Sequence, residues 1–116
     1  MDTSESTPGK VIIAPEVLIT IAKLSTLSVP GVAGMAAVPG GIDRYVRRGY
    51  ADGVRILVKE NTIEADLYIV IQGHVNAHAV SAAVQQEVAR ALNDMVGMDA
   101  GRINVHVADV AFKEEA

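Results

Sequence analysis

The longest regular pattern in this sequence is an alternation of apolar and polar residues over residues 62–72, which only Val70 interrupts. Alternation over about ten positions indicates a β-strand with one face in a hydrophobic core and the other open to solvent or to a partner. A second alternating run occupies residues 54–60, and Glu60-Asn61-Thr62 joins the two as a short polar turn. Two such runs around a tight turn predict a β-hairpin. The apolar set consists of Val54, Ile56, Val58, Ile63, Ala65, Leu67, Ile69 and Ile71.

Two other stretches have helical periodicity. The first helix is predicted to begin at Pro15, because proline at the first helical position followed by the acidic Glu16 is typical of a helix start, and to stop at residues 28–31. Its expected buried face carries Val17, Ile21 and Leu24, with Leu18 and Ala22 beside them. The second helix is predicted to be capped by Asn76 and to end at Gly97. Its expected apolar stripe consists of Val80, Val84, Val88, Leu92 and Met95.

Shorter strands complete the predicted fold. A β-branched run at residues 10–14 predicts a first strand, residues 32–38 form either a strand or an extended connection, and an alternating run at residues 103–107 predicts the last strand. The expected order is β-α-β-β-α-β. We therefore predict an α+β fold, a two-layer sandwich in which a mainly antiparallel sheet has both helices on one face. The ferredoxin-like split arrangement is favoured because both helices then cover the same face.

At 116 residues the chain fits one domain, which we place at residues 9–112. Residues 1–8 are polar and acidic, without the basic and apolar regions of a signal peptide, and are expected to form a disordered N-terminal tail. Residues 113–116 are expected to form a C-terminal tail. No apolar run approaches the roughly 20 residues that span a bilayer, and the absence of cysteine excludes disulfides and thiolate zinc sites. We expect a cytoplasmic protein without direct membrane insertion.

Histidine spacing and short motifs give no support for a metal or cofactor site. His74 and His78 have the i, i+4 spacing of a metal pair, but the predicted helix starts between them and no third ligand stands nearby in the sequence. Pro39-Gly40-Gly41 lacks both common phosphate-binding patterns, and no nucleophile turn is present. We therefore expect no cofactor, no metal and no covalent catalysis.

The carboxylates of the long strand have a simple structural explanation. Glu64 and Asp66 lie two residues apart on one face, as a pair of carboxylates for acid/base chemistry would. Arg55 and Lys59 occupy the polar face of the neighbouring predicted strand, so we expect cross-strand ion pairs in place of catalysis. His106 is expected to be a solvated strand position. No catalytic residue is predicted.

The clearest candidate binding feature is a loop rich in arginine and tyrosine within residues 39–53, the long stretch without a regular period. These are the residue types enriched at binding hot spots, and loops on rigid scaffolds often carry function. Asp43 and Asp52 offset part of the positive charge, so a solvated loop is the alternative. The partner-binding candidates are Arg44, Tyr45, Arg47, Arg48 and Tyr50 in the loop, and Tyr68 on the long strand.

A set of short motifs, in order along residues 10–112, resembles the bacterial alkaline shock protein family, also called envelope stress response proteins. The resemblance implies a cytoplasmic, non-enzymatic protein that self-associates and is brought to the membrane by a small anchor protein; some members occur beside genes for a fatty-acid kinase. Val96 replaces a common threonine and no basic extension follows Phe112, which leaves the partner open. The matching motifs are Gly9-Lys10-Val11, Ile13-Ala14-Pro15-Glu16-Val17, Ile21-Ala22, Val29-Pro30-Gly31-Val32, Gly53-Val54, Asp66-Leu67-Tyr68-Ile69-Val70, Gly73 with Asn76, Val84-Gln85 with Val88, Met95-Val96-Gly97, and Ile103-Asn104-Val105 with Val107.

Two functional hypotheses follow, and a third, an enzyme, is disfavoured because it would need a substrate pocket built from residues to which we assign a structural role. The first is a non-catalytic interaction and assembly protein of the bacterial envelope stress response, which binds itself and a membrane-anchored partner. The second is a small RNA-binding module, since several such modules pair a sheet with two helices. A formal net charge of −4 disfavours nucleic acid, as do Glu64 and Asp66 on the strand face where stacking aromatics would be expected.

Overall fold

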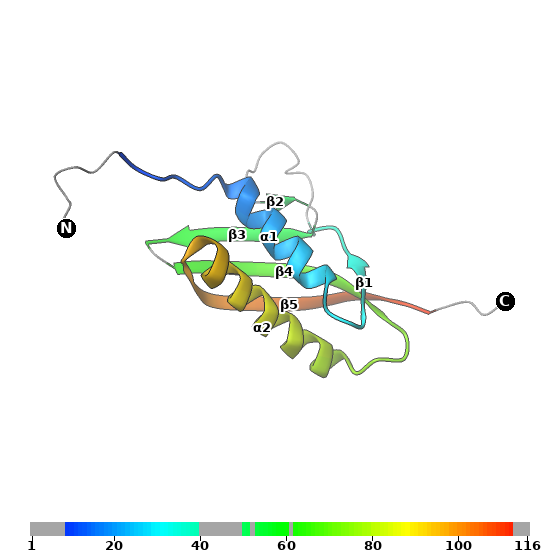
Figure 1. Ribbon diagram of the computed structural model, residues 1–116. Helices are drawn as coiled ribbons and strands as arrows, with labels where there is room; N and C mark the ends of the chain where they lie inside the picture. Colours follow the sequence, from blue (N-terminus) through cyan, green and yellow to red (C-terminus); the bar gives the residue numbers. More distant parts are fainter. Residues whose placement is uncertain (1–8, 40–49, 52, 61, 113–116) are drawn as a thin grey trace.

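The computed structural model describes residues 9–39, 50–51, 53–60 and 62–112. Two helices and five strands form two layers (Figure 1). The α+β class and the two-layer arrangement are as predicted from the sequence. The elements are α1 (Pro15–Leu27), β1 (Val32–Met35), β2 (Tyr50–Ala51), β3 (Val54–Lys59), β4 (Thr62–Gln72), α2 (Ala77–Val96) and β5 (Asp99–Ala111).

Strand β4 is the centre of the sheet. Its first half pairs antiparallel with β3, from Val54 opposite Leu67 to Lys59 opposite Thr62, which confirms the predicted hairpin. Its second half pairs antiparallel with β1, and β2 pairs with the outer side of β3. The whole length of β4 pairs in parallel with β5. Because a strand has two edges, β1 and β3 share one edge of β4 and β5 occupies the other.

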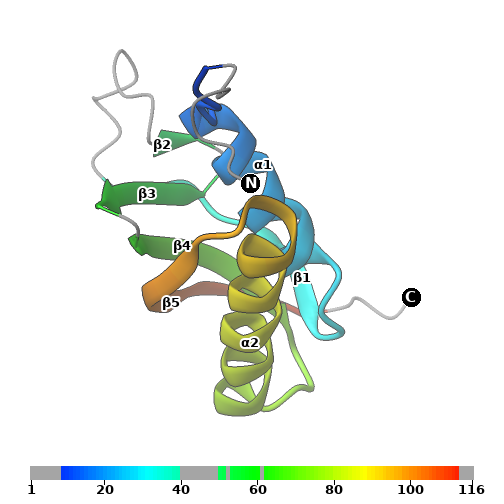
Figure 2. The same ribbon diagram turned by 60° about the vertical axis from the view of Figure 1, so that its left-hand side comes forward.

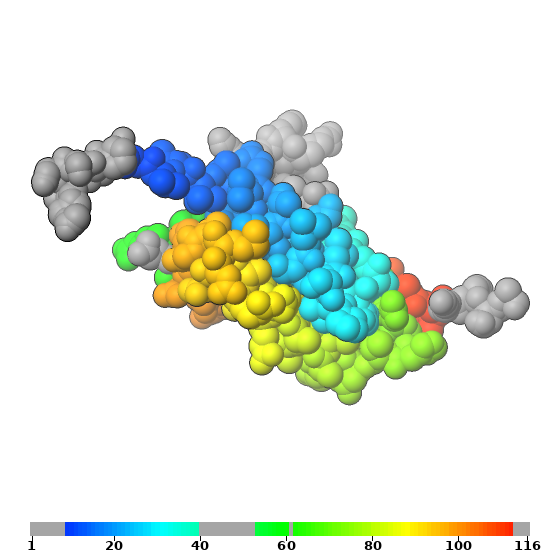
Figure 3. All heavy atoms as spheres, in the orientation of Figure 1, coloured from blue at the N-terminus to red at the C-terminus, as the bar shows by residue number. Residues whose placement is uncertain are grey.

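The parallel pairing of β4 and β5 explains the position of α2. Parallel neighbours need a crossover connection, and α2 is that connection (Figure 1). Both helices lie on the same face of the sheet, which Figure 2 shows from the side. In the space-filling view α1 and α2 lie side by side over this face (Figure 3). The opposite face of the sheet has no helix on it, among the residues that the structure describes.

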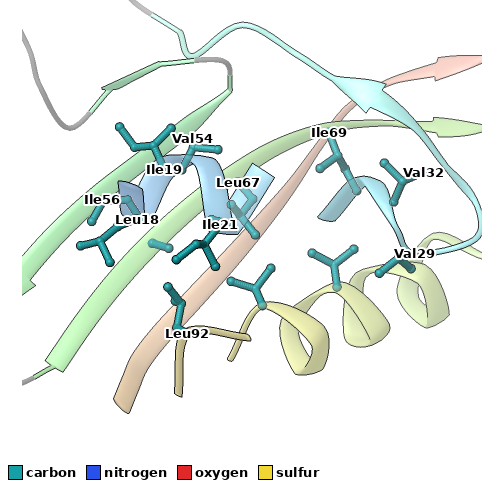
Figure 4. Packing of buried hydrophobic residues seen from close by; sticks show 14 of the residues in the cluster. Leu18, Ile19, Ile21, Val29, Val32, Val54, Ile56, Leu67, Ile69 and Leu92 are labelled. Carbon is teal, nitrogen blue, oxygen red and sulfur yellow. The ribbon is translucent and has the colours of Figure 1, made fainter. Parts of the chain in front are cut away.

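The core lies between the helices and the sheet (Figure 4). From the sheet it takes the apolar set of the alternating runs except Val58, which is 46% exposed; Ile63, Leu67 and Ile69 are fully buried. From α2 it takes a stripe repeating every four residues, as predicted. The buried α2 side chains are Val80, Val84, Val88 and Leu92.

Local signals in the sequence place the helix ends correctly. Pro15 is the first residue of α1. The side-chain oxygen of Asn76 accepts a hydrogen bond from the backbone N–H of Ala79 at 2.9 Å, which satisfies one free donor at the start of α2. Gly97 ends α2 in the left-handed conformation, with φ of 70°, which glycine adopts without steric cost.

The buried face of α1 differs from the prediction. Leu18, Ile19, Ala22 and the hydrogen-bonded Thr26 are buried together with Ile21, whereas Val17 and Leu24 are exposed. Apolar residues cover much of the helix circumference, so periodicity alone does not decide which stripe meets the sheet. Met95 of α2, predicted to be buried, is also exposed, because Val96 continues the four-residue spacing and packs against the core in its place.

Residues 10–14 form no strand with any other described residue, in contrast to the expected first strand. The segment is extended and leads away from the start of α1 (Figure 1). Its β-branched composition favours a strand, but both edges of β4 are already occupied. The last strand is longer than predicted, since pairing with β4 extends it from Asp99 to Ala111.

Candidate functional site

The helix-free side of the sheet, which we call the open sheet face, carries many of the polar side chains of β3, β4 and β5. Its residues alternate with the core residues, because successive side chains in a strand point to opposite faces. The pairing registers bring three strands together here. The open sheet face consists of Arg55, Leu57 and Lys59 on β3, Thr62, Glu64, Asp66, Tyr68, Val70 and Gln72 on β4, and Arg102, Asn104 and His106 on β5.

Asp66 is the hub of this face. It lies opposite Arg55 in one register and opposite Asn104 in the other. Arg55 donates from Nε and Nη2 to Oδ2 of Asp66, at 3.1 and 2.9 Å. Nδ2 of Asn104 donates to Oδ1 at 3.1 Å, and Nε2 of His106 lies 3.1 Å from the same oxygen. Both carboxylate oxygens are therefore occupied by side chains from neighbouring strands.

These contacts determine the ionisation of Asp66. Partial burial acts to raise the pKa of its carboxyl group, because it removes water from the charged form. The hydrogen bonds from His106, Arg55 and Asn104 and the positive charge of Arg55 outweigh this, and they hold the pKa below its ordinary value. Asp66 is thus a structural anion at neutral pH, and a carboxylate with this many donors is a poor proton acceptor.

His106 does more than the sequence suggested. Its ring stacks on the ring of Tyr68, with centroids 4.3 Å apart and planes 7° from parallel. The two residues are register partners in β4 and β5. The expectation of a plain solvated position is therefore wrong, because the parallel pairing places His106 beside both Asp66 and Tyr68. Tyr68, a predicted binding residue, is largely buried under this stack.

A shallow depression of about 380 Å³ lies beside the hub. Its lining combines a salt-bridged pair with the exposed apolar side chain of Leu57. The predicted cross-strand ion pairs are confirmed, since Arg55 pairs with Asp66 at 2.9 Å and Lys59 with Glu64 at 3.6 Å. The lining residues are Arg55, Ile56, Leu57, Glu64, Asp66 and Asn104.

The arginine-rich loop lies mostly outside the described residues. Arg44, Tyr45, Arg47 and Arg48 belong to that part of the chain. The backbone of Tyr50 forms β2 and pairs with Arg55, so the end of the loop is joined to β3, the strand that carries the arginine partner of Asp66. Within the described residues no group of three or more His, Asp or Glu side chains could hold a metal ion, and His74 and His78 are not part of such a group.

Several large apolar side chains of the described residues are exposed. Val11 and Ile12 are 88% and 81% exposed, and Leu24 on the outer side of α1 is 60% exposed. Met95 at the end of α2 is 67% exposed. No helix in the described ranges is long and apolar enough to cross a membrane. Isolated exposed apolar residues are normal on a soluble protein, whereas a contiguous apolar patch is typical of a contact surface. Val11 and Ile12 are adjacent in the chain and are the most exposed large apolar residues among those described. In the sequence, Leu24 and Met95 fit core-facing stripes and Val11 and Ile12 fit a strand, so their exposure was not predicted.

Comparison with solved structures places the fold among known ones. A variant of the MamM CTD has a TM-score of 0.55 and 20% identity, over 85% of this chain and 96% of that one. A zinc form of the MamM CTD has a TM-score of 0.55 and 17% identity, over 86% of this chain and 87% of that one. At this identity the likeness concerns the fold alone.

Sequence comparison is more specific. The uncharacterized protein YqhY of Bacillus subtilis is 31% identical over 118 aligned residues, which cover 100% of this chain and 87% of that protein. The uncharacterized protein Spy1535 of Streptococcus pyogenes is 28% identical, over 91% of this chain and 82% of that protein. The model of the alkaline shock protein 23 family, described as having a cell envelope-related function, matches residues 3–112. The chain therefore belongs to the alkaline shock protein 23 family.

Proposed function

We propose that this chain is a non-catalytic assembly protein of the bacterial envelope stress response, which acts in the cytoplasm by self-association and by binding a membrane-anchored partner. Membership of a family with a cell envelope-related function supports the setting. The proposal concerns contacts between proteins, and the chemistry of the described surfaces suits that role.

The observation that carries the proposal is the contrast between the open sheet face and the exposed apolar side chains. On the open sheet face, three side chains hydrogen-bond to the Asp66 carboxylate, so these polar groups already have partners within the domain. Outside the core, apolar side chains at Ile12, Leu24 and Met95 are exposed to solvent. A domain whose polar cluster is hydrogen-bonded internally, while large apolar side chains remain exposed, is suited to bind other proteins.

The arginine-rich loop is the proposed contact with the membrane-anchored partner. Its candidate residues remain Arg44, Tyr45, Arg47, Arg48 and Tyr50. The described end of the loop is β2, whose backbone pairs with β3.

Binding to membranes tests the partner. Purified protein is mixed with bacterial membranes and, separately, with vesicles made from the extracted lipids of those membranes. We expect it to co-sediment with the membranes and not with the vesicles, because the anchor is a protein. The triple change of Arg44→Glu, Arg47→Glu and Arg48→Glu should abolish co-sedimentation, whereas Arg90→Glu on α2 should not.

Two results would contradict this part of the proposal. Equal co-sedimentation of the triple variant would remove the arginine-rich loop from the contact. Equal binding to lipid vesicles would replace the protein anchor by a direct lipid contact. A filter-binding assay with RNA at low salt addresses the other hypothesis, and retention of RNA at low micromolar protein would favour it over the assembly role.

A further inference from the structure

We propose that residues 10–13 of one copy add as an edge strand to β5 of a second copy, along residues 104–107. This inference rests on the self-association proposed above and assigns it a surface. The described chain has two unpaired features that do not pair with each other within one molecule. One is a strand-forming segment without a strand partner, and the other is a long sheet edge without a neighbour.

The donor segment is ready to pair. Val11, Ile12 and Ile13 are consecutive β-branched residues, the type that favours strands. The segment is already extended (Figure 1), and the exposure of Val11 and Ile12 shows that they make almost no contact with the rest of the described residues. Ile13 packs against the core and fixes the base of the segment. Pairing would therefore order few additional residues, which keeps the entropic cost of association low.

The acceptor edge is long and only partly protected. Strand β5 has 13 residues and pairs only with β4, among the described residues. Such edges are usually shielded by charged side chains or by bulges. Here the irregularities lie at residues 101 and 108, where the register with β4 shifts, so residues 102–107 are regular. The carbonyl of Ile103 already accepts a hydrogen bond from Gln85 at 2.9 Å, which leaves residues 104–107.

The chemistry of this stretch suits the donor. Residues 104–107 contain no Asp, Glu, Lys or Arg, and the charges of Arg102 and Asp109 lie outside it. Val107 is 39% exposed on the helix side of the edge. An added strand would place β-branched side chains of the donor beside Val105 and Val107, and such cross-strand pairs stabilise sheets.

The two features cannot meet within one copy as the fold stands. The donor segment precedes α1, which packs over β3 on one edge of β4, while β5 occupies the other edge. In both ribbon views the segment leads away from β5 (Figures 1 and 2). Donor and acceptor are different surfaces, so the contact is heterologous, and the proposed arrangement is an open head-to-tail one in which each added copy leaves a free donor and a free acceptor at the ends. Association should therefore continue beyond dimers.

The test uses one variant on each side of the contact and a matched control. Ile12→Pro removes a backbone N–H and the strand geometry of an exposed residue, so it disables the donor without touching the core. Val107→Lys places a charge on the acceptor edge. Val110→Lys is the control for the acceptor, because Val110 is 38% exposed and lies beyond the register shift. Val17→Lys is the control for α1, because Val17 is 45% exposed and lies outside the proposed contact.

Sedimentation velocity should show growth of the wild-type chain and of both controls with concentration. Ile12→Pro and Val107→Lys should each weaken association by at least about tenfold in Kd. A mixture of the two disabled variants should form a one-to-one dimer and nothing larger, because only one functional contact remains. Unchanged circular dichroism and thermal midpoint would show that both variants are folded.

The possible failures are distinct. If the wild type associates and Ile12→Pro associates equally, the strand addition is wrong and self-association uses another surface. If Val110→Lys is as disruptive as Val107→Lys, or if the mixture stays monomeric, pairing along residues 104–107 is likewise overturned. If the wild-type chain is monomeric at every concentration, the self-association proposed above fails, and this inference fails with it.

Discussion

Removal of the Asp66 carboxylate should be the most costly single change on the open sheet face. Asp66→Ala leaves Arg55, Asn104 and His106 without their shared acceptor. Hydrogen bonds to a charged group contribute roughly 1.5–3 kcal/mol to stability. Their loss costs less where water can replace the missing acceptor for the donors that remain. The side chains of Arg55 and His106 are about two-fifths exposed, whereas that of Asp66 is 19% exposed. We therefore expect a loss of about 2 kcal/mol in the free energy of unfolding.

Glu64→Ala is the matched control, since Glu64 lies on the same strand and the same face. It makes one ion pair, at 3.6 Å from Lys59, whose side chain is more than half exposed. Exposed pairs of this kind contribute about 0–1 kcal/mol. Urea unfolding followed by circular dichroism gives both values. Equal losses for the two variants would refute the argument that Asp66 is the hub.

The pH dependence gives a second check on Asp66. Its pKa in the folded protein lies below the ordinary value of 3.8, so the unfolded chain binds the proton more tightly. Stability from this group is therefore present above about pH 4 and is lost as the pH falls through the folded pKa. The difference in the free energy of unfolding between the wild type and Asp66→Ala should have its largest value at pH 7 and should shrink below about pH 4. A difference that grows on acidification would contradict the assignment.

Three further changes test the fold. Leu92→Ala should lower the free energy of unfolding by about 3 kcal/mol, because Leu92 is fully buried. Met95→Ala, at an exposed position three residues on, should lower it by less than about 0.5 kcal/mol. Similar losses for the two variants would contradict the placement of Leu92 in the core. Asn76→Ala should cost about 1 kcal/mol through loss of the cap to Ala79, and a neutral result in urea unfolding would argue against that cap. His106→Ala should cost about 1 kcal/mol through its stack on Tyr68, and unchanged tyrosine fluorescence would argue against the stack.

Much of the fold could be predicted because its signals are local. Alternation at residues 54–60 and 62–72 depends on the geometry of a single strand, so the hairpin can be predicted from residues that are close together in the sequence. Asn76 and Gly97 act on the helix end next to them, so the bounds of α2 also follow. The pairing of Arg55 with Asp66 was within reach, because a hairpin register fixes which residues face each other.

The rest depends on contacts between distant segments. The parallel pairing of β4 with β5 brings Asn104 and His106 to Asp66, and nothing near any of these residues in the sequence encodes that register. The rotation of α1 is decided by the shape of the sheet and of α2, so Val17 and Leu24 were assigned to the wrong side. Residues 10–14 have strand composition, but local sequence cannot supply the neighbouring strand that pairing requires.

Self-association is the central claim of this account, and sedimentation velocity of the unmodified chain tests it most directly. The measurement covers about three decades of concentration at neutral pH, with no partner added. We predict that the weight-average sedimentation coefficient rises steadily with concentration and passes the value for a dimer. A single monomeric species at every concentration would contradict the account.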